Sequence, residues 1–124
     1  MTTNDSIFWI RVNGYLKLTT RNLIRGNKFY NEKIVFSNNQ EYRVWEPYKS
    51  KLGAAILNGL EILPIIEKSS VLYLGTSEVV TLSHISDIIG TESVVYAVEH
   101  SHESAKELTE KLVPKRDNIK PIIM

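Results

Sequence analysis

The chain has 124 residues, of which 43% are hydrophobic and 23% charged, and a formal net charge of +1. This length and composition predict one small folded domain or two very small ones, and exclude a disordered or fibrous chain. The absence of cysteine excludes disulfide frameworks, thiolate zinc sites and cysteine nucleophiles. No apolar run reaches the roughly 18 residues of a membrane span and the start lacks a signal-peptide pattern, so we expect a soluble, cytoplasmic protein without a membrane segment.

The charges are distributed unevenly along the chain. Residues 1–53 carry nine Lys and Arg and four Asp and Glu, whereas residues 54–124 carry six basic and ten acidic groups. A basic first half is compatible with a surface for nucleic acid or an acidic partner, because Lys and Arg neutralise phosphates additively. The alternative, which charge statistics favour, is that these Lys and Arg residues have no binding role and are the solvated ends of amphipathic strands.

The first 46 residues predict a small antiparallel β unit. Four short strands are expected, over residues 7–12, 15–19, 33–36 and 41–45. Asn13-Gly14 is typical of a type I′ hairpin turn, and residues 37–40 form a second loop rich in turn formers. These patterns predict an N-terminal β domain over residues 1–46.

From residue 47 onwards the pattern predicts alternating helices and strands. Helices are expected over residues 49–60, over 81–89 with a stop at Gly90, and from a Ser101 cap to about residue 113. Strands are expected over residues 70–75, 93–98 and 119–124. Strands that alternate with helices imply right-handed crossovers and a parallel sheet, so the predicted fold class is α/β, with a second domain over residues 47–124.

Two features at the carboxyl ends of the predicted parallel strands suggest a nucleoside cofactor site. A loop over residues 75–81 follows the first strand at Gly75, and Glu99 ends the next strand about 24 residues later. A carboxylate at that place can accept hydrogen bonds from both hydroxyls of a ribose. Equally compatible is a Glu99 that is solvated or caps the helix beginning near Ser101.

Four segments of the chain resemble the fibrillarin family, the 2′-O-methyltransferases of box C/D ribonucleoproteins. They are residues 41–57 (EYRVWEPYKSKLGAAIL), 71–75 (VLYLG), 83–90 (SHISDIIG) and 94–99 (VVYAVE), in the order and spacing of the family. The resemblance covers about residues 40–124. The strand-rich start is similar to the N-terminal β domain of archaeal members, which lack the Gly/Arg-rich extension of eukaryotic ones.

The resemblance implies a small antiparallel β domain followed by the first part of a class I, Rossmann-like methyltransferase sheet. It implies methylation of a ribose 2′-hydroxyl in ribosomal or transfer RNA with S-adenosyl-L-methionine, at sites chosen by a guide RNA. The implied partners are a Nop-domain scaffold protein, a kink-turn-binding protein, the box C/D guide RNA and the substrate RNA.

Family positions also suggest roles for individual residues. Lys51 matches the first lysine of the family's catalytic tetrad, where an ammonium can orient the ribose hydroxyl and favour its deprotonated form; without the resemblance it is an exposed helix lysine. The cofactor-contact positions of the family fall on Gly75, Val80, Thr81, Glu99 and His100, with Glu99 on the cofactor ribose.

Other chemistry-bearing residues have less specific interpretations. Arg43 and Lys49 are candidates for RNA or partner contact, although a solvated strand end is equally compatible. No metal site is expected, because the histidines lack helical i, i+4 spacing and there is no cysteine. Three aromatic residues are expected in the core or at a domain interface, namely Trp9, Trp45 and Tyr48.

The cofactor loop departs from the family pattern at three positions. Glu78 replaces a serine, Val79 the second glycine and Val80 the first threonine. A β-branched residue in place of glycine costs about 1–3 kcal/mol of strain or forces a different loop. Glu78 is also expected to place a negative charge near the carboxylate of the cofactor, so these residues put cofactor binding in question.

The chain ends at Met124, before the family's catalytic aspartate, second lysine and histidine, so a member truncated after its third strand is expected. A second polypeptide could complete the sheet, and the apolar surface otherwise exposed is expected to include Val94, Val95, Ile122 and Ile123. Two alternatives to catalysis are a non-catalytic ribonucleoprotein component docked on the scaffold protein and a decayed fragment.

Overall fold

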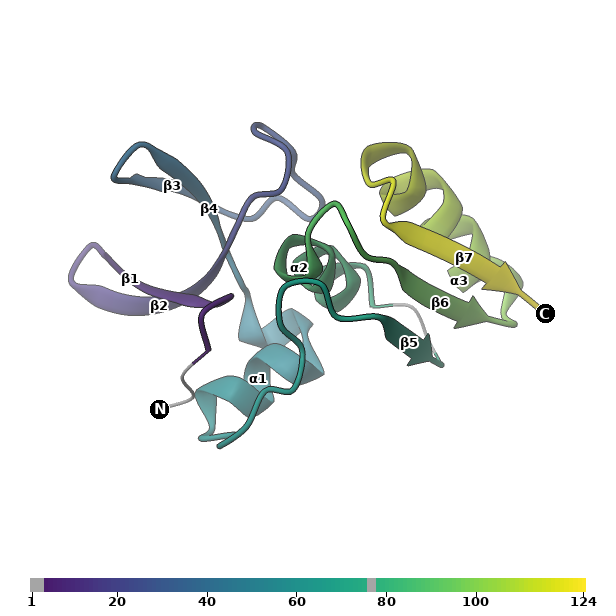
Figure 1. The fold of residues 1–124 in the computed structure, drawn as a ribbon, viewed down its shortest axis with the longest axis horizontal. Coiled ribbons are helices and arrows are strands. Elements are labelled where there is room, and N and C mark those ends of the chain that lie inside the picture. Colours follow the sequence, from purple (N-terminus) through teal and green to yellow (C-terminus); the bar gives the residue numbers. More distant parts are fainter. Residues whose placement is uncertain (1–3, 76–77) are drawn as a thin grey trace.

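The computed structural model describes residues 4–75 and 78–124, which form an antiparallel and a parallel sheet (Figure 1). The antiparallel sheet has the strand order β1-β2-β4-β3, with β1 (Phe8–Val12), β2 (Tyr15–Arg21), β3 (Ile34–Ser37) and β4 (Gln40–Val44). Asn13 and Gly14 have φ values of 50° and 84°, which confirms the turn predicted between β1 and β2. The four expected strands are therefore confirmed, with ends that move by one or two residues.

The parallel sheet has the order β5-β6-β7, formed by β5 (Val71–Leu74), β6 (Val95–Glu99) and β7 (Ile119–Ile123). Between β5 and β6 lies α2 (Val79–Ile89). Between β6 and β7 lies α3 (His102–Glu107), which continues as the π-helical η2 (Leu108–Leu112) and the 3-10 helix η3 (Val113–Lys115). The two sheets and their helices confirm the α/β class.

Helix α1 (Lys51–Leu57) is shorter than the helix expected over residues 49–60. Ser50 has extended backbone angles and separates α1 from the preceding 3-10 helix η1 (Pro47–Lys49). The Ser50 hydroxyl caps α1 by accepting a hydrogen bond from Gly53 N. Gly53 has a steric role, because a Cβ there would lie 2.7 Å from the indole nitrogen of Trp45.

Helix α2 connects the two halves of the structure and is buried along its whole length. On one side, Leu82 and Ile85 pack in a cluster with η2 and the parallel sheet. On the other side, Val80 and Ile88 pack in a second cluster with the β domain and α1. Helix α2 begins at Val79 rather than at the expected Thr81, and the two additional residues, Val79 and Val80, pack in the first and the second cluster, respectively.

A buried ion cluster joins α2 to segments far away in the sequence. The carboxylate of Asp87 accepts a hydrogen bond from Arg43 of β4 at 2.8 Å and from Arg116, which precedes β7, at 2.6 Å. All three side chains have no solvent exposure. Arg43 also pairs with Glu32 at 2.8 Å, so its charge is shared between two carboxylates. The predicted division of domains at residue 46 stays a prediction, but this cluster ties the two sides together.

The ring of His84 lies next to the ion cluster and links α2 to the β domain. It stacks on Trp45 with ring centroids 4.7 Å apart. Its nitrogens form hydrogen bonds with the hydroxyls of Thr20 at 2.7 Å and Tyr30 at 2.6 Å. Burial, followed by the charges of Arg43 and Arg116, holds the pKa of His84 well below its ordinary value.

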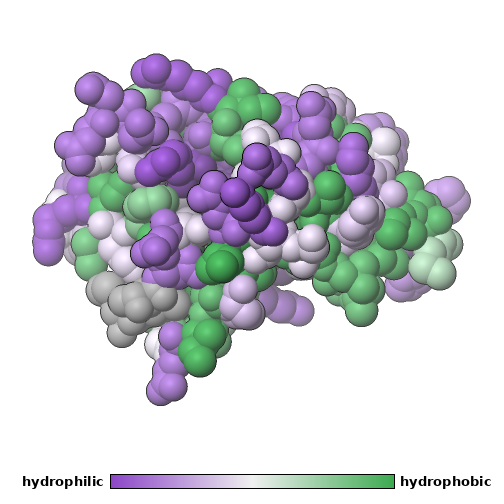
Figure 2. Space-filling view, in the orientation of Figure 1, coloured by the Kyte–Doolittle hydropathy of each residue, from purple (hydrophilic) through white to green (hydrophobic). Residues whose placement is uncertain are grey.

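One face of the parallel sheet is not covered by helices of the described chain. Leu72 and Leu74 of β5, Tyr96 of β6 and Ile122 of β7 are all 39% or more exposed. Strand register places Leu72 beside Tyr96, so these side chains form one surface, and hydrophobic groups gather over this part of the molecule (Figure 2).

The expected apolar surface is therefore confirmed at Ile122 and Ile123 but wrong at Val95. Strand alternation turns Val95 toward the helices, where it has no exposure, and Val94, which precedes β6, is half-buried. Among the aromatic residues, Trp45 is buried as expected and Trp9 is half-buried, whereas Tyr48 is 96% exposed. Among the helices described, none has the length and apolarity to cross a membrane.

The ion cluster predicts a large effect of Asp87→Asn. Removing this carboxylate charge leaves Arg43 and Arg116 buried with less compensation, and we expect the free energy of unfolding to fall by about 3–5 kcal/mol. Chemical denaturation followed by circular dichroism measures this loss. Exposed Asp117 provides the matched control, and equal stability of Asp87→Asn and Asp117→Asn would contradict the role of the cluster.

The lowered pKa of His84 predicts that the protein loses stability in mild acid. Below pH 6.5 the unfolded chain takes up a proton that the folded histidine does not, so the free energy of unfolding should fall by about 1.4 kcal/mol per pH unit. His84→Gln should be less stable near neutral pH but should vary less between pH values of about 7 and 5. Denaturant titrations at several pH values test this, with exposed His102→Gln as the control; a slope unchanged by His84→Gln would refute it.

Candidate cofactor and catalytic site

The carboxyl edge of the parallel sheet brings two of the expected cofactor residues side by side. Leu74 and Val98 are paired in register, so Gly75 and Glu99 follow at the same edge. Gly75 has a φ of 110°, and no atom of the described residues beyond its chain neighbours lies within 4 Å of the place where a Cβ would be. Of the expected loop over residues 75–81, positions 76 and 77 lie outside the described residues.

Glu99 is buried at the end of β6, with 1% of its surface exposed. One oxygen of its carboxylate accepts hydrogen bonds from the backbone nitrogens of His100 at 3.1 Å and Ser101 at 3.3 Å. The Ser101 hydroxyl caps α3 by accepting from Ser104 N at 3.4 Å, which confirms the expected cap. These contacts fix the Glu99 carboxylate beside the start of α3, while His100 is exposed.

Glu78 joins three elements at the edge of the site. Its carboxylate accepts hydrogen bonds from Lys51 N at 3.2 Å, from the Tyr73 hydroxyl at 3.2 Å and from the Thr81 hydroxyl at 3.1 Å. Burial, together with the Glu78 charge, raises the pKa of Tyr73 to about 12, which keeps this hydroxyl protonated as a donor. Glu78 therefore connects the start of α2 to β5 and to the start of α1.

A second connection between α1 and α2 runs through Ser50. Its hydroxyl lies 2.6 Å from that of Thr81, and it accepts a hydrogen bond from the Trp45 indole nitrogen at 2.9 Å. Lys51 follows Ser50 as the first residue of α1, and its side chain is exposed. The backbone at Lys51 is thus held by Glu78 and, through Ser50, by Thr81 and Trp45, while its side chain extends into solvent.

The expected site residues fall into distinct groups in space. Lys51 and Thr81 lie together at the adjoining helix starts, whereas Glu99 and His100 lie at the end of β6. Val80 is 8% exposed and packs in the cluster shared with the β domain, so its side chain is turned away from solvent.

Of the two outcomes expected for Val79, backbone strain or a different loop, strain is not found at Val79 itself. Val79 is the first residue of α2 and is not among the described residues with positive φ. Its side chain is buried in the cluster on the side of the parallel sheet, so the β-branched residue is accommodated within the helix.

The structure separates the two candidates for RNA or partner contact. Arg43 has no solvent exposure, and its guanidinium binds Glu32, Asp87 and α2, so the expectation of an RNA or partner contact there is wrong. The physical reason is that strand alternation directs Arg43 toward α2. Lys49 is exposed on η1 and stays a candidate.

Sequence reasoning missed the supporting role of Ser50 and Tyr73. A signal for Ser50 was present, since serine three residues before Gly53 at the start of an apolar helical pattern is typical of an N-cap. No pattern in the sequence indicated the bond between Tyr73 and Glu78. Among the described residues, no group of three or more His, Asp or Glu side chains is arranged to hold a metal ion.

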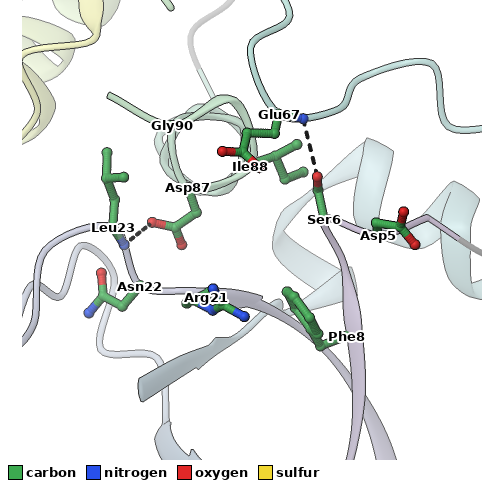
Figure 3. A pocket seen from close by; sticks show the side chains of 10 residues that line it. All are labelled: Asp5, Ser6, Phe8, Arg21, Asn22, Leu23, Glu67, Asp87, Ile88 and Gly90. Carbon is green, nitrogen blue, oxygen red and sulfur yellow. Dashed lines mark hydrogen bonds between the residues drawn. The ribbon is translucent and has the colours of Figure 1, made fainter. Parts of the chain in front are cut away.

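A pocket of about 230 Å³ lies at the other end of α2, away from the carboxyl edge (Figure 3). There Asp87 accepts a hydrogen bond from Leu23 N at 2.9 Å, and Ser6 accepts one from Glu67 N at 3.2 Å. The first contact attaches the segment after β2 to α2, and the second attaches the N-terminal segment to the segment that precedes β5. The pocket therefore belongs to the junction between the sheets, not to the candidate site.

The link through Ser50 predicts a measurable effect of Ser50→Ala. This change removes the cap of α1 and leaves the Trp45 indole without its acceptor, so we expect a loss of about 1–3 kcal/mol in the free energy of unfolding. Thermal and chemical denaturation measure the change. Exposed Ser70→Ala is the control, and a Ser50→Ala variant as stable as Ser70→Ala would contradict the assignment.

Comparison with known proteins places this chain in a family. The family model described as Fibrillarin matches residues 1–124. The fibrillarin-like rRNA/tRNA 2′-O-methyltransferase of Thermococcus onnurineus is 48% identical over 115 residues, which cover 93% of this chain and 50% of that protein. The protein of the same name from Pyrococcus furiosus is 46% identical over 110 residues, which cover 89% and 48%. The chain spans about half the length of the curated relatives it matches.

Solved structures agree with the sequence comparison. Aeropyrum pernix fibrillarin in complex with natively bound S-adenosyl-L-methionine is similar with a TM-score of 0.89 and 39% identity, over 99% of this chain and 55% of that one. A chain of a fibrillarin/Nop5p complex is similar with a TM-score of 0.75 and 35% identity, over 98% and 52%. The resemblance carried by residues 41–57 and the three later segments is confirmed, and the chain belongs to the fibrillarin family.

Proposed function

We propose that this chain contributes the cofactor-binding part of a methyltransferase that transfers a methyl group to ribose 2′-hydroxyls of ribosomal or transfer RNA, directed by box C/D guide RNA. The observation that carries the proposal is that Gly75 and Glu99 follow the paired residues Leu74 and Val98 at the carboxyl edge of the sheet. The names of the relatives and the bound S-adenosyl-L-methionine of the Aeropyrum structure support it.

The described residues fit S-adenosyl-L-methionine in three respects. Open space above Gly75 allows close approach of a ligand to the backbone. The buried Glu99 carboxylate, fixed by two backbone donors, is placed to accept bonds from ribose hydroxyls. The first turn of α2, including Val80 and Thr81, has N–H groups without acceptors within the helix, and these favour a carboxylate.

In this proposal the residues that hold the cofactor are Gly75, Val80, Thr81, Glu99 and His100. Val80 and Thr81 act through their backbone, because their side chains are buried. S-adenosyl-L-methionine, when bound, supplies an electrophilic methyl group. Lys51 places an ammonium near the ribose hydroxyl, where its charge orients that hydroxyl and favours the deprotonated form.

The proposed partners follow from the family and from the surface of the sheet. The fibrillarin/Nop5p complex supports docking to a Nop-domain scaffold protein. A kink-turn-binding protein, the guide RNA and the substrate RNA complete the proposed particle, and a cytoplasmic location stays a prediction. The uncovered face with Leu72, Leu74 and Tyr96 is the surface on which we propose that further methyltransferase residues pack, in this or a second polypeptide.

A second candidate function is a non-catalytic ribonucleoprotein component, and the position of Glu78 favours it. The Glu78 carboxylate lies at the start of α2, where a cofactor carboxylate would be bound, and the two like charges repel each other. In this alternative the chain docks to the scaffold through its β domain, and the hydrogen bonds of Glu78 close the loop without a cofactor.

Titration calorimetry with S-adenosyl-L-methionine distinguishes the two functions. We expect binding by the chain, or by the chain mixed with the part of the Thermococcus relative that it does not match. Glu99→Gln should weaken binding about tenfold or more, because an uncharged amide replaces the carboxylate that accepts from the ribose. Glu78→Gln should strengthen it by removing the like charge.

Glu103→Gln, an exposed change on α3, is the control and should leave the affinity unchanged. Absence of binding at millimolar cofactor in both preparations would exclude the methyltransferase proposal and favour the non-catalytic component.

A further inference from the structure

A groove of about 250 Å³ lies on the β domain, where β2, the start of β3, the end of β4 and η1 meet. Its apolar floor includes Tyr30 and Val44. Its lining includes three exposed lysines from three separate segments, Lys17 of β2, Lys33 before β3 and Lys49 of η1. The groove therefore gathers cations that the sequence places far apart.

The positive charge of this groove is not cancelled by its acidic neighbours. None of the ion pairs between described residues involves Lys17, Lys33 or Lys49. Glu32, at the same groove, is buried against Arg43 at 2.8 Å. Glu46 accepts a hydrogen bond from Tyr48 N at 3.2 Å as the cap of η1, and three lysines exceed its single charge.

Exposed tyrosines next to two of the groove lysines add a second recognition property. Tyr48 precedes Lys49 on η1 and is 96% exposed, and Tyr15 is 71% exposed with the Lys17 ammonium 5.9 Å from its ring centroid. Exposed tyrosine faces beside lysines are typical of surfaces on which unpaired bases stack. A second lysine–tyrosine contact lies inside the groove, with the Lys49 ammonium 5.9 Å from the Tyr30 ring centroid.

One of the groove lysines lies two residues before the candidate catalytic residue. Lys49 is the last residue of η1, and Lys51 is the first of α1, with only the capping Ser50 between them. Because the Ser50 hydroxyl is hydrogen-bonded to Trp45 and Thr81, the backbone between Lys49 and Lys51 is anchored to the core. An RNA strand that reaches Lys51 can therefore also contact Lys49, two residues away, and continue into the groove on the β domain.

We propose that this groove binds a single-stranded RNA segment, with Lys17, Lys33 and Lys49 on its phosphates and Tyr48 stacked on an unpaired base. The proposal rests on the proposed function, because it assigns a track for the RNA presented to Lys51. Lysines provide mobile point charges that suit a phosphate chain. The exposed tyrosine favours RNA over an acidic peptide, because every nucleobase offers a ring to stack on.

Fluorescence anisotropy with a short, labelled single-stranded RNA over a range of salt concentrations tests the groove. Replacing the three groove lysines with glutamine should weaken binding at low salt at least tenfold. It should also reduce the slope of log affinity against log salt by about 2, because each phosphate contact contributes about 0.7. Tyr48→Ala should weaken binding about fivefold or more without changing the slope.

A matched variant with the same loss of charge replaces three exposed lysines elsewhere, Lys68, Lys106 and Lys120. It should keep most of the affinity and the slope. Equal losses in the two triple variants, or binding of polyglutamate in preference to RNA, would overturn the proposal. Circular dichroism should show unchanged folding, since all the replaced side chains are exposed.

The groove and the cofactor site have separate readouts. The groove variants should bind S-adenosyl-L-methionine as the parent chain does, and Glu99→Gln should bind RNA as the parent chain does. Loss of RNA binding only in the groove variants supports the groove even if the chain binds no cofactor. Cofactor binding combined with RNA affinity that is unaffected in the groove variants would leave the proposed function intact and reject the groove.

Discussion

The ion pairs of Asp87 with Arg43 and Arg116 are the constraint on which the arrangement of this molecule depends. The Asp87 carboxylate, without side-chain exposure, is compensated in charge by two guanidinium groups, from β4 and from the segment before β7, and accepts further hydrogen bonds from the Thr20 hydroxyl and from Leu23 N. Both arginines are buried as well, so the removal of any one of the three groups leaves a buried charge without its full compensation. The pairs therefore hold both sheets in one position against α2.

The same helix carries this constraint to the candidate site. The C-terminal half of α2 contains Asp87 and His84, and its first turn contains Thr81. Because α2 is anchored near its C-terminal end by Asp87, its first turn places Thr81 within hydrogen-bonding distance of Ser50. Ser50 caps α1, which begins at Lys51. The backbone position of a candidate catalytic lysine is thus connected through α2 to charges buried near the other end of that helix.

The substitutions in the cofactor loop have a structural explanation in this arrangement. Val79 and Val80 extend α2 and pack into the two apolar clusters on either side of it. Glu78 forms three hydrogen bonds that connect α2, β5 and α1. The residues that depart from the family pattern are therefore packed and hydrogen-bonded at the start of α2, while Gly75 and Glu99 lie at the same edge of the parallel sheet.

The sequence by itself determined the elements and the family. Asn13-Gly14 specified a hairpin because few other dipeptides adopt two positive φ angles, and the change from alternating to helical spacing after residue 47 indicated the parallel half. The motif over residues 41–57 identified the fibrillarin family, and with it Lys51 and Glu99 as candidates. These features depend on residues that are close together in the sequence, so they can be recognised without the tertiary structure.

Only the tertiary structure decided which charged residues are available for recognition. Arg43 and Lys49 carry the same charge and are six residues apart, yet one is enclosed by Asp87 and Glu32 while the other lines a groove with Lys17 and Lys33. Burial depends on segments distant in sequence, because the partners of Arg43 come from α2 and a separate loop. The period of a strand shows that two residues lie on opposite faces, but only packing shows which face is covered.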